Sequence, residues 1–211
     1  MNIYAISGLG ADKRVYSYLS LNQELIHLEW IKNYKNELLK DYSLRLAEKI
    51  DTSKEFIIIG LSFGGLVAVE ISKFLKPKHT ILISSVETKC EIPLFYKLTG
   101  KSKIFNLIPT YFLAKSNSFL TFMFGTKKKE LLKNIIEDAD TFFSKWAVIQ
   151  LMNWNNEEKL KNCTKIGGSN DRILPQKNID FMIQYAGHFM IVDNAEELSR
   201  ILNDLFKKVS F

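Results

Sequence analysis

The stretch Phe56-Ile57-Ile58-Ile59-Gly60-Leu61-Ser62-Phe63-Gly64 decides the fold of this 211-residue chain. Its first five residues form an uninterrupted apolar run, which predicts a central strand of a parallel sheet. The segment that follows, residues 64–75, is apolar nearly all round, so we expect a helix that is buried on most sides. Pro77 predicts that this helix stops at Lys76. This stretch therefore predicts a buried strand that passes directly into a buried helix.

The same alternation of strands and helices extends in both directions from this stretch. Apolar, β-branched runs predict further strands at residues 3–7, 26–31, 80–83, 163–167 and 181–185. Helical spacing separates several of these runs and returns near the end of the chain, in the stripe Leu198, Ile201, Leu202, Leu205 and Phe206. We predict an α/β protein with a mostly parallel, twisted sheet of about six strands and helices on both faces.

The segment between the predicted strands at 80–83 and 163–167 differs in composition from the rest. Residues 92–155 contain 9 lysines and 4 acidic residues, whereas residues 1–91 and 156–211 are almost neutral. The same segment holds 12 of the 26 aromatic residues, among them Phe95, Tyr96, Phe105, Tyr111, Phe112, Phe119 and Trp146. We expect a core of residues 1–91 and 156–211, with residues 92–155 inserted in it as a helical cap, or lid.

The charge of this insert has two interpretations. Lysines beside aromatic side chains could bind nucleic acid or an anionic membrane. Alternatively, the insert consists of amphipathic helices with solvated lysines outside and packed aromatics inside. We favour the second interpretation, because no nucleic-acid-binding motif accompanies the charge.

The overall composition excludes several classes of protein. Hydrophobic residues make up 46% and charged residues 25% of the chain, so intrinsic disorder is excluded. The chain has no run of about 18 uncharged apolar residues, so we expect no membrane-spanning helix. Cys90 and Cys163 cannot form a disulfide framework and lack the spacing of metal ligands. No basic segment precedes the first apolar run, and we therefore expect a cytoplasmic protein.

The motif most informative about chemistry is Gly60-Leu61-Ser62-Phe63-Gly64, a G-x-S-x-G sequence between the predicted strand and helix. So tight a turn strains the backbone of its serine, and glycines two residues before and after it remove clashes with bulkier neighbours. The following helix points free N–H groups at the serine, where they favour developing negative charge. Ser62 is therefore the candidate nucleophile.

A serine nucleophile needs a base, and the chain has three histidines, which are His27, His79 and His188. His27 and His79 begin predicted strands, so we expect both at the end of the sheet remote from an active site. His188 follows the last predicted strand, on a carboxyl-end loop where ligands bind in such sheets. Gly187 lets the chain turn there. We predict that His188 is the catalytic base.

The base in turn needs a carboxylate that orients it, and two aspartates are candidates. Asp171 follows the predicted strand 163–167, which places it on the carboxyl-end loop one strand away from His188. Asp193 also follows the last strand, but the final helix begins next to it, so we expect it to act at that helix's amino terminus. The predicted triad is Ser62, Asp171 and His188, in that chain order.

Two backbone N–H groups are candidates for holding the negative oxygen of a reaction intermediate. In a G-x-S-x-G site one of them belongs to the residue after the nucleophile, here Phe63. The other belongs to the loop after the first predicted strand. That loop is Ser7-Gly8-Leu9-Gly10, in which two glycines permit close backbone approach. We therefore expect the N–H of Leu9 to be the second donor.

Together these motifs resemble those of the α/β-hydrolase superfamily. The resemblance is carried by Ser7-Gly8-Leu9-Gly10, by the G-x-S-x-G motif, by Asp171 with Gly168, and by Gly187-His188. It spans nearly the whole chain except the insert, which stands where the family places its lid.

The sequence departs from the family pattern in three ways. Ser7 replaces the usual histidine before the oxyanion glycine. The leading antiparallel strands of the fold are absent, since the chain starts at the strand before the oxyanion loop. The short spacing between Asp171 and His188 leaves only a turn around Pro175 where the family has a helix.

The resemblance implies a compact, esterase-like serine hydrolase that cleaves a carboxylic ester with an apolar acyl or alcohol part through an acyl-enzyme. It implies no metal and no organic cofactor. The sequence leaves open a thioesterase, a triad-dependent lyase of the cyanohydrin type, and a ligand-binding or signalling protein without turnover. The expected partner is a small-molecule ester, with no nucleic acid and no stable membrane anchoring, and the sequence does not determine an oligomeric state.

Overall fold

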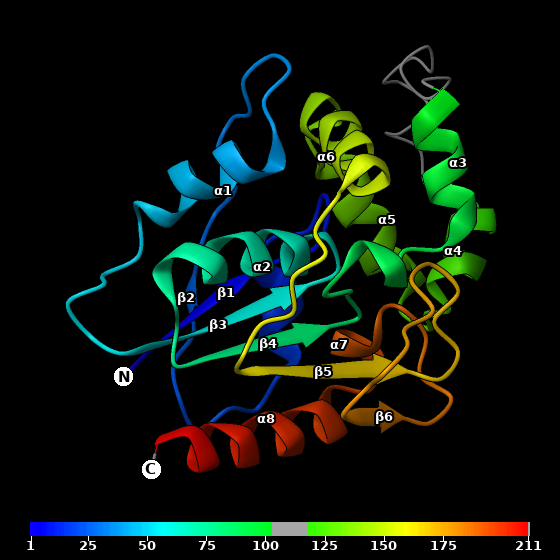
Figure 1. Ribbon diagram of the computed structural model, residues 1–211. Coiled ribbons are helices and arrows are strands. Elements are labelled where there is room, and N and C mark those ends of the chain that lie inside the picture. Colours follow the sequence, from blue (N-terminus) through cyan, green and yellow to red (C-terminus); the bar gives the residue numbers. More distant parts are fainter. Residues whose placement is uncertain (103–117, 211) are drawn as a thin grey trace.

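A computed structural model describes residues 1–102 and 118–210 (Figure 1). Its centre is a six-stranded sheet in the order β2-β1-β3-β4-β5-β6, and all neighbouring strands are parallel. The strands are β1 (Asn2–Ile6), β2 (Ile26–His27), β3 (Phe56–Leu61), β4 (His79–Ile83), β5 (Cys163–Gly168) and β6 (Phe181–Ile183). The predicted α/β class and the parallel sheet are confirmed.

Strand β3 lies in the middle of the sheet because both of its faces are apolar. Every residue of β3 is buried. Ile58 packs in the core on one face of the sheet, and Ile57 and Ile59 pack in the core on the other, which is the alternation expected of a strand. Because β3 pairs in parallel with β1 and β4, the carboxyl ends of these three strands meet at one edge.

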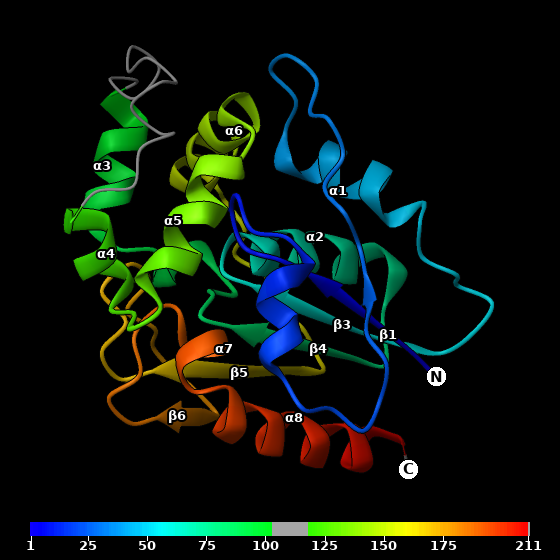
Figure 2. The same cartoon turned by 180° about the vertical axis from the view of Figure 1, so that it is seen from behind.

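Helices cover both faces of the sheet (Figures 1 and 2). On one face α1 (Leu39–Ala47) packs against α2 (Phe63–Leu75), and on the other lie the 3-10 helix η1 (Lys13–Tyr18), α7 (Met190–Asp193) and α8 (Ala195–Ser210). The predicted stripe of the last helix is turned to the core, with Leu198, Leu202, Leu205 and Phe206 buried. The extended central strand and the two helical layers thus fix a carboxyl-end edge on which loops can carry a site.

The strand predicted at 26–31 is much shorter in the structure. The N–H of Leu28 still donates to the carbonyl of Ala5 at 2.9 Å, and the chain then leaves the sheet. Trp30 packs against Tyr42 and Phe143, with ring centroids 6.3 and 5.0 Å away. The indole is thus partly buried against helices rather than beside a strand, which the local pattern did not indicate.

The described part of the insert between β4 and β5 consists of helices joined by loops. After the short η2 (Lys89–Glu91) come α3 (Leu94–Ser102), α4 (Ser118–Phe124), α5 (Lys129–Asp138) and α6 (Thr141–Asn153). Its aromatic side chains divide between two environments: Phe143 and Trp146 are buried, whereas Phe95, Phe122 and Phe142 are exposed. Phe105, Tyr111, Phe112 and the side chain of Phe119 lie outside the described residues. The expectation that the aromatics pack inside is therefore correct for only some of them.

Among the residues that the structure describes, no helix is both long enough and apolar enough to cross a membrane.

Candidate active site

The site lies where the order of the strands reverses. The chain runs from β1 outward to β2 and then returns past β1 to form β3. At such a point the loops that follow two neighbouring strands depart in opposite directions and leave a crevice between them. Here these loops are Ser7-Gly8-Leu9-Gly10 after β1 and the turn at Ser62 after β3, so the topology brings the two predicted motifs to the same point of the sheet edge.

Ser62 occupies a strained turn between β3 and α2. Its backbone has φ 51° and ψ −120°, a conformation that side-chain-bearing residues rarely adopt. The turn is held on both sides, because the Ser62 N–H donates to the carbonyl of Ile83 at 2.9 Å and the N–H of Gly65 donates to the Ser62 carbonyl at 2.9 Å. The surrounding sheet therefore fixes the direction of the Ser62 hydroxyl.

Two glycines make this turn possible through close backbone contacts. A Cβ atom on Gly60 would lie 2.4 Å from the Cα of Gly65, and one on Gly64 would lie 2.3 Å from the carbonyl oxygen of Ser7. Both distances are too short for any side chain without movement of the backbone. The spacing of the G-x-S-x-G motif thus has a steric cause in this fold.

The three predicted triad residues form one chain of contacts, although they come from distant parts of the sequence. The Ser62 Oγ lies 2.9 Å from Nε2 of His188, and the His188 Nδ1 lies 2.8 Å from Oδ2 of Asp171. His188 and Asp171 are 4% and 5% exposed. Because a carboxylate oxygen can only accept, the Nδ1 carries the proton and the Nε2 is free to accept the serine proton.

The carboxylate of Asp171 is itself fixed by its own loop. Its Oδ1 accepts the N–H groups of Ile173 and Leu174, each at 2.9 Å. As expected, no helix lies between Asp171 and His188, and the loop passes through Pro175. The second carboxylate oxygen is therefore left to face His188.

Asp193 does not contact His188, but its predicted role is wrong. It is the last residue of α7, and its Oδ1 accepts the N–H of Lys127 at 3.2 Å. Asn194, the next residue, lies between α7 and α8. The last helix begins close to where it was expected, but the short helix α7, which sequence patterns missed, comes directly before it. Asp193 ends α7 and binds the backbone of the insert instead.

The two expected oxyanion donors belong to segments that adjoin the serine. Phe63 is the first residue of α2, so its N–H has no acceptor within the helix. A Cβ atom on Gly8 would lie 3.4 Å from the Cβ of Ser62, which shows how closely the loop carrying Leu9 approaches the nucleophile. The arrangement is compatible with N–H groups of Leu9 and Phe63 facing a common oxygen.

Three neighbours of the triad were not identified from the sequence. The Ser85 hydroxyl donates to the Ser62 carbonyl at 2.7 Å, and it comes directly after β4, at the same sheet edge. The ring of Phe124, at the end of α4, packs edge-on against the His188 imidazole at 5.4 Å. Burial, and then the nearby Asp171 carboxylate, raises the pKa of the Tyr96 phenol. Of the three, only Ser85 could have been predicted from the sequence, because it follows a predicted strand and so lies at the carboxyl-end edge of the sheet.

The other two histidines lie outside this group. His79 is the first residue of β4, as expected, and its Nε2 lies 2.8 Å from Oγ1 of Thr164. His27 was expected at the same remote end, and this is wrong. Because β2 is so short, His27 pairs with Ala5, and its Nε2 lies 3.4 Å from Oγ of Ser7 at the start of the oxyanion loop.

Within residues 1–102 and 118–210, no group of three or more His, Cys, Asp or Glu side chains is arranged to hold a metal ion.

Comparisons with solved structures identify the fold. An esterase from Exiguobacterium antarcticum superposes with a TM-score of 0.72 at 13% identity, over 98% of this chain and 92% of that chain. A thermophilic esterase from Thermogutta terrifontis gives 0.69 at 13% identity, over 99% and 90% of the two chains. A meta-cleavage product hydrolase from Pseudomonas fluorescens gives 0.66 at 15% identity, over 99% and 91%. No protein-family model matches the chain, and no curated protein matches it. The chain has the α/β-hydrolase fold.

Proposed function

We propose that this protein is a serine hydrolase that cleaves carboxylic esters with an apolar acyl or alcohol part. The observation that carries the proposal is the continuous set of contacts from the Ser62 Oγ through His188 to the Asp171 carboxylate, at 2.9 and 2.8 Å. These distances are within the range for proton transfer from a serine nucleophile to its base. The esterases among the similar structures support the same type of substrate.

In the first half of the proposed reaction, the Ser62 Oγ attacks the ester carbonyl carbon while His188 Nε2 takes the serine proton. The carbonyl oxygen becomes negative and is held by the N–H groups of Leu9 and Phe63. Asp171 stabilises the imidazolium and keeps the ring oriented. The tetrahedral intermediate collapses, His188 returns the proton to the departing alcohol, and the acyl group remains on Ser62.

In the second half, a water molecule replaces the alcohol. His188 removes a proton from this water, which attacks the acyl carbon, and the same two N–H groups hold the oxyanion again. Collapse of the second intermediate returns the proton to Ser62 and releases the carboxylic acid. Every step uses groups of the chain itself.

The preference for an apolar substrate is supported by the side chains around the crevice. Leu9, Trp30, Tyr96 and Ile173 are partly buried hydrophobic residues that pack on the core next to Phe63 and Asp171. Polar groups in these surroundings would lose hydration without finding partners. An apolar acyl chain bound there would instead leave water and pack against these hydrophobic side chains, which is favourable.

As part of the same proposal, residues 92–155 form the lid of the site, and residues 1–91 and 156–211 form its core. The support is local: the Phe124 ring contacts His188, and the Phe124 carbonyl accepts the Phe189 N–H at 3.4 Å. The end of α4 thus lies on the loop that carries the base. A lid so placed would decide which acyl groups reach Ser62.

The proposal is tested with p-nitrophenyl esters of increasing acyl length, measured for the unaltered protein and for two histidine variants. We expect hydrolysis that saturates with substrate and is lost in His188→Gln. The matched control is His79→Gln, at the amino end of β4, which should keep full activity. Equal activity of the two variants, or the absence of hydrolysis by the unaltered and folded protein, would contradict the proposal.

A further inference from the structure

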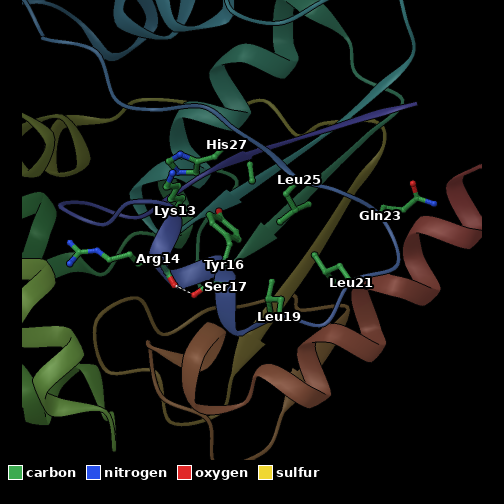
Figure 3. Close-up of a pocket in the computed structure, with 10 residues that line it drawn as sticks. Lys13, Arg14, Tyr16, Ser17, Leu19, Leu21, Gln23, Leu25 and His27 are labelled. Carbon is green, nitrogen blue, oxygen red and sulfur yellow. Dashed lines mark hydrogen bonds between the residues drawn. The ribbon is translucent and has the colours of Figure 1, made fainter.

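A cavity lies outside the proposed active site, between η1 and the edge strand β2 (Figure 3). It has a volume of about 490 Å³, which is in the range of cavities that hold small organic molecules. Its walls come from β1, η1, the following loop and β2, and its lining includes neither Ser62 nor His188. Any ligand bound here would therefore leave the triad free.

One end of this cavity is basic. Its lining includes Lys13, Arg14 and His27 but no carboxylate. Arg14 is already paired with Asp12 and Asp138, both at 2.8 Å. Lys13 is exposed, and no ion pair of its ammonium is found with residues 1–102 or 118–210. Lys13 thus contributes positive charge that no neighbouring acid neutralises by direct contact.

His27 adds a second unsatisfied polar group at this end. The Ser7 hydroxyl donates to the carbonyl of Ala11 at 2.7 Å. The His27 Nε2, which lies 3.4 Å from the Ser7 Oγ, is therefore the donor of that pair. The Nδ1 is then left unprotonated, and it is buried without a hydrogen-bond partner among the described residues. Burial lowers the pKa of His27, opposed by Glu29 and Asp12 and assisted by Lys13. An anion in the cavity would favour the protonated ring through its negative charge.

The rest of the cavity is mostly apolar, with Ser17 and Gln23 as the other polar residues of its lining. Leu19, Leu21 and Leu25 line it, and Figure 3 shows them on the side away from Lys13 and His27. The Tyr16 ring forms part of the wall, and its hydroxyl is occupied by donation to the Ile6 carbonyl at 2.8 Å. A small inorganic anion would leave this apolar surface in contact with water, and a neutral lipid would leave Lys13 unused.

We propose that this cavity binds the carboxylate of a medium-chain fatty acid, with its head group beside Lys13 and His27 and its chain along the three leucines. One ligand would then interact with both the basic end of the cavity and its apolar wall. An adjacent cavity of about 420 Å³ shares Lys13, Arg14 and His27 but is also lined by Asp12 and Glu29. The two carboxylates disfavour an anion there, which directs the head group to the first cavity.

The test is isothermal titration calorimetry of the Ser62→Ala protein, in which binding is measured independently of the proposed ester hydrolysis. Octanoate should bind with one site per chain. Affinity should rise about fourfold for each methylene from butyrate to octanoate, because each added group is buried against the leucines. Octanol, which has the same chain without the charge, should bind at least about tenfold more weakly.

The location is tested with two lysine variants in the same background. Lys13→Glu should weaken octanoate binding at least about tenfold, because it reverses the charge beside the head group. Lys40→Glu is the matched control, because Lys40 is equally exposed but lies on α1 and lines neither cavity. No octanoate binding by folded protein, equal binding of octanol, or equal effects of the two variants would overturn the proposal.

Discussion

The crevice between β1 and β3 and the helices α3 to α6 differ in what holds their residues in place. Ser62 is fixed by hydrogen bonds to β4 and α2, and His188 by Asp171. In the insert, by comparison, Phe95 and Phe142 are 69% and 75% exposed. The first region depends on backbone geometry within one sheet, and the second on amphipathic helices with part of their apolar surface in water.

On the proposed function, this difference separates two tasks, the chemical reaction and the selection of substrates. Chemistry requires atoms held to within a fraction of an ångström, which the edge of a parallel sheet provides. Selection among substrates requires only a surface that favours some acyl groups over others. On the proposed function, changes in the core should abolish the reaction, whereas changes in the insert should alter its substrate preference.

The largest expected effect is that of Ser62→Ala, measured as kcat/KM with a short p-nitrophenyl ester. Activity should fall at least about a thousandfold, to what binding and the oxyanion donors alone supply. The free energy of unfolding should not fall, because the alanine removes a hydroxyl from a strained turn without leaving a cavity. Ser53→Ala, at an exposed position where, among the described residues, the hydroxyl bonds only to Asp51, should keep the full kcat/KM. A Ser62→Ala variant that keeps most of its activity would place the chemistry elsewhere.

The next largest effect should distinguish the two candidate aspartates. Asp171→Asn should lower kcat at least about a hundredfold, because an amide can stabilise the wrong tautomer of His188 and cannot stabilise its charged form. Asp193→Asn should keep kcat within a few-fold, since Asp193 contacts only the Lys127 backbone among the interactions described. Steady-state kinetics of both variants are the measurement, and the reverse order of effects would exchange the roles.

A smaller effect concerns the stability of the turn at Ser62 between β3 and α2. Gly60→Ala would bring a Cβ atom to 2.4 Å from the Cα of Gly65, whereas Gly8→Ala would meet nothing closer than 3.4 Å. We expect the first variant to lower the free energy of unfolding by about 2 kcal/mol, and the second to lower it by much less. Urea denaturation of both proteins measures this difference. Similar midpoints would mean that the turn relaxes easily and that its strain is not imposed by packing.

The smallest expected effect belongs to the insert. Tyr96→Ala, at a partly buried position near Asp171, should shift the preferred acyl length and change kcat/KM for long esters by a few-fold. Hydrolysis of a short ester should remain nearly unchanged, because the triad is untouched. The control is Phe142→Ala, at an exposed position on α6. If the acyl-length profiles of all three proteins coincide, the insert does not select the substrate.

The membrane interpretation of the insert makes a contrasting prediction. If its lysines bind anionic lipid, the protein should associate with phosphatidylserine vesicles at low salt and dissociate as salt is raised. On the account favoured here, a vesicle sedimentation assay should detect little association at either salt concentration.

The sequence predicted the core of this protein well for a physical reason. A buried parallel strand must be apolar, so 56–60 could be recognised without knowing its neighbours. A serine flanked by glycines at fixed spacing identifies a turn that few other sequences tolerate. The contacts among Ser62, Asp171 and His188 could be anticipated because carboxyl ends of parallel strands share one edge.

What could not be predicted depended on contacts between distant residues. The end of β2 is set by the packing of Trp30 against Tyr42 and Phe143, which no local pattern contains. The position of Asp193 depends on the four-residue helix α7, too short to produce a recognisable periodicity. The cavity at His27 followed from the same early end of β2. The catalytic roles of the site residues and of Leu9 and Phe63 stay predictions until they are measured.

The most direct test of the central claim is covalent labelling with a fluorophosphonate, followed by peptide mapping by mass spectrometry. The reagent reacts with serines that are activated by a base and face an oxyanion site. We expect a single label, on the peptide that contains Ser62, with no labelling of Ser62→Ala and much slower labelling of His188→Gln. A folded protein that takes up no label, or takes it up on a serine other than Ser62, would contradict the account.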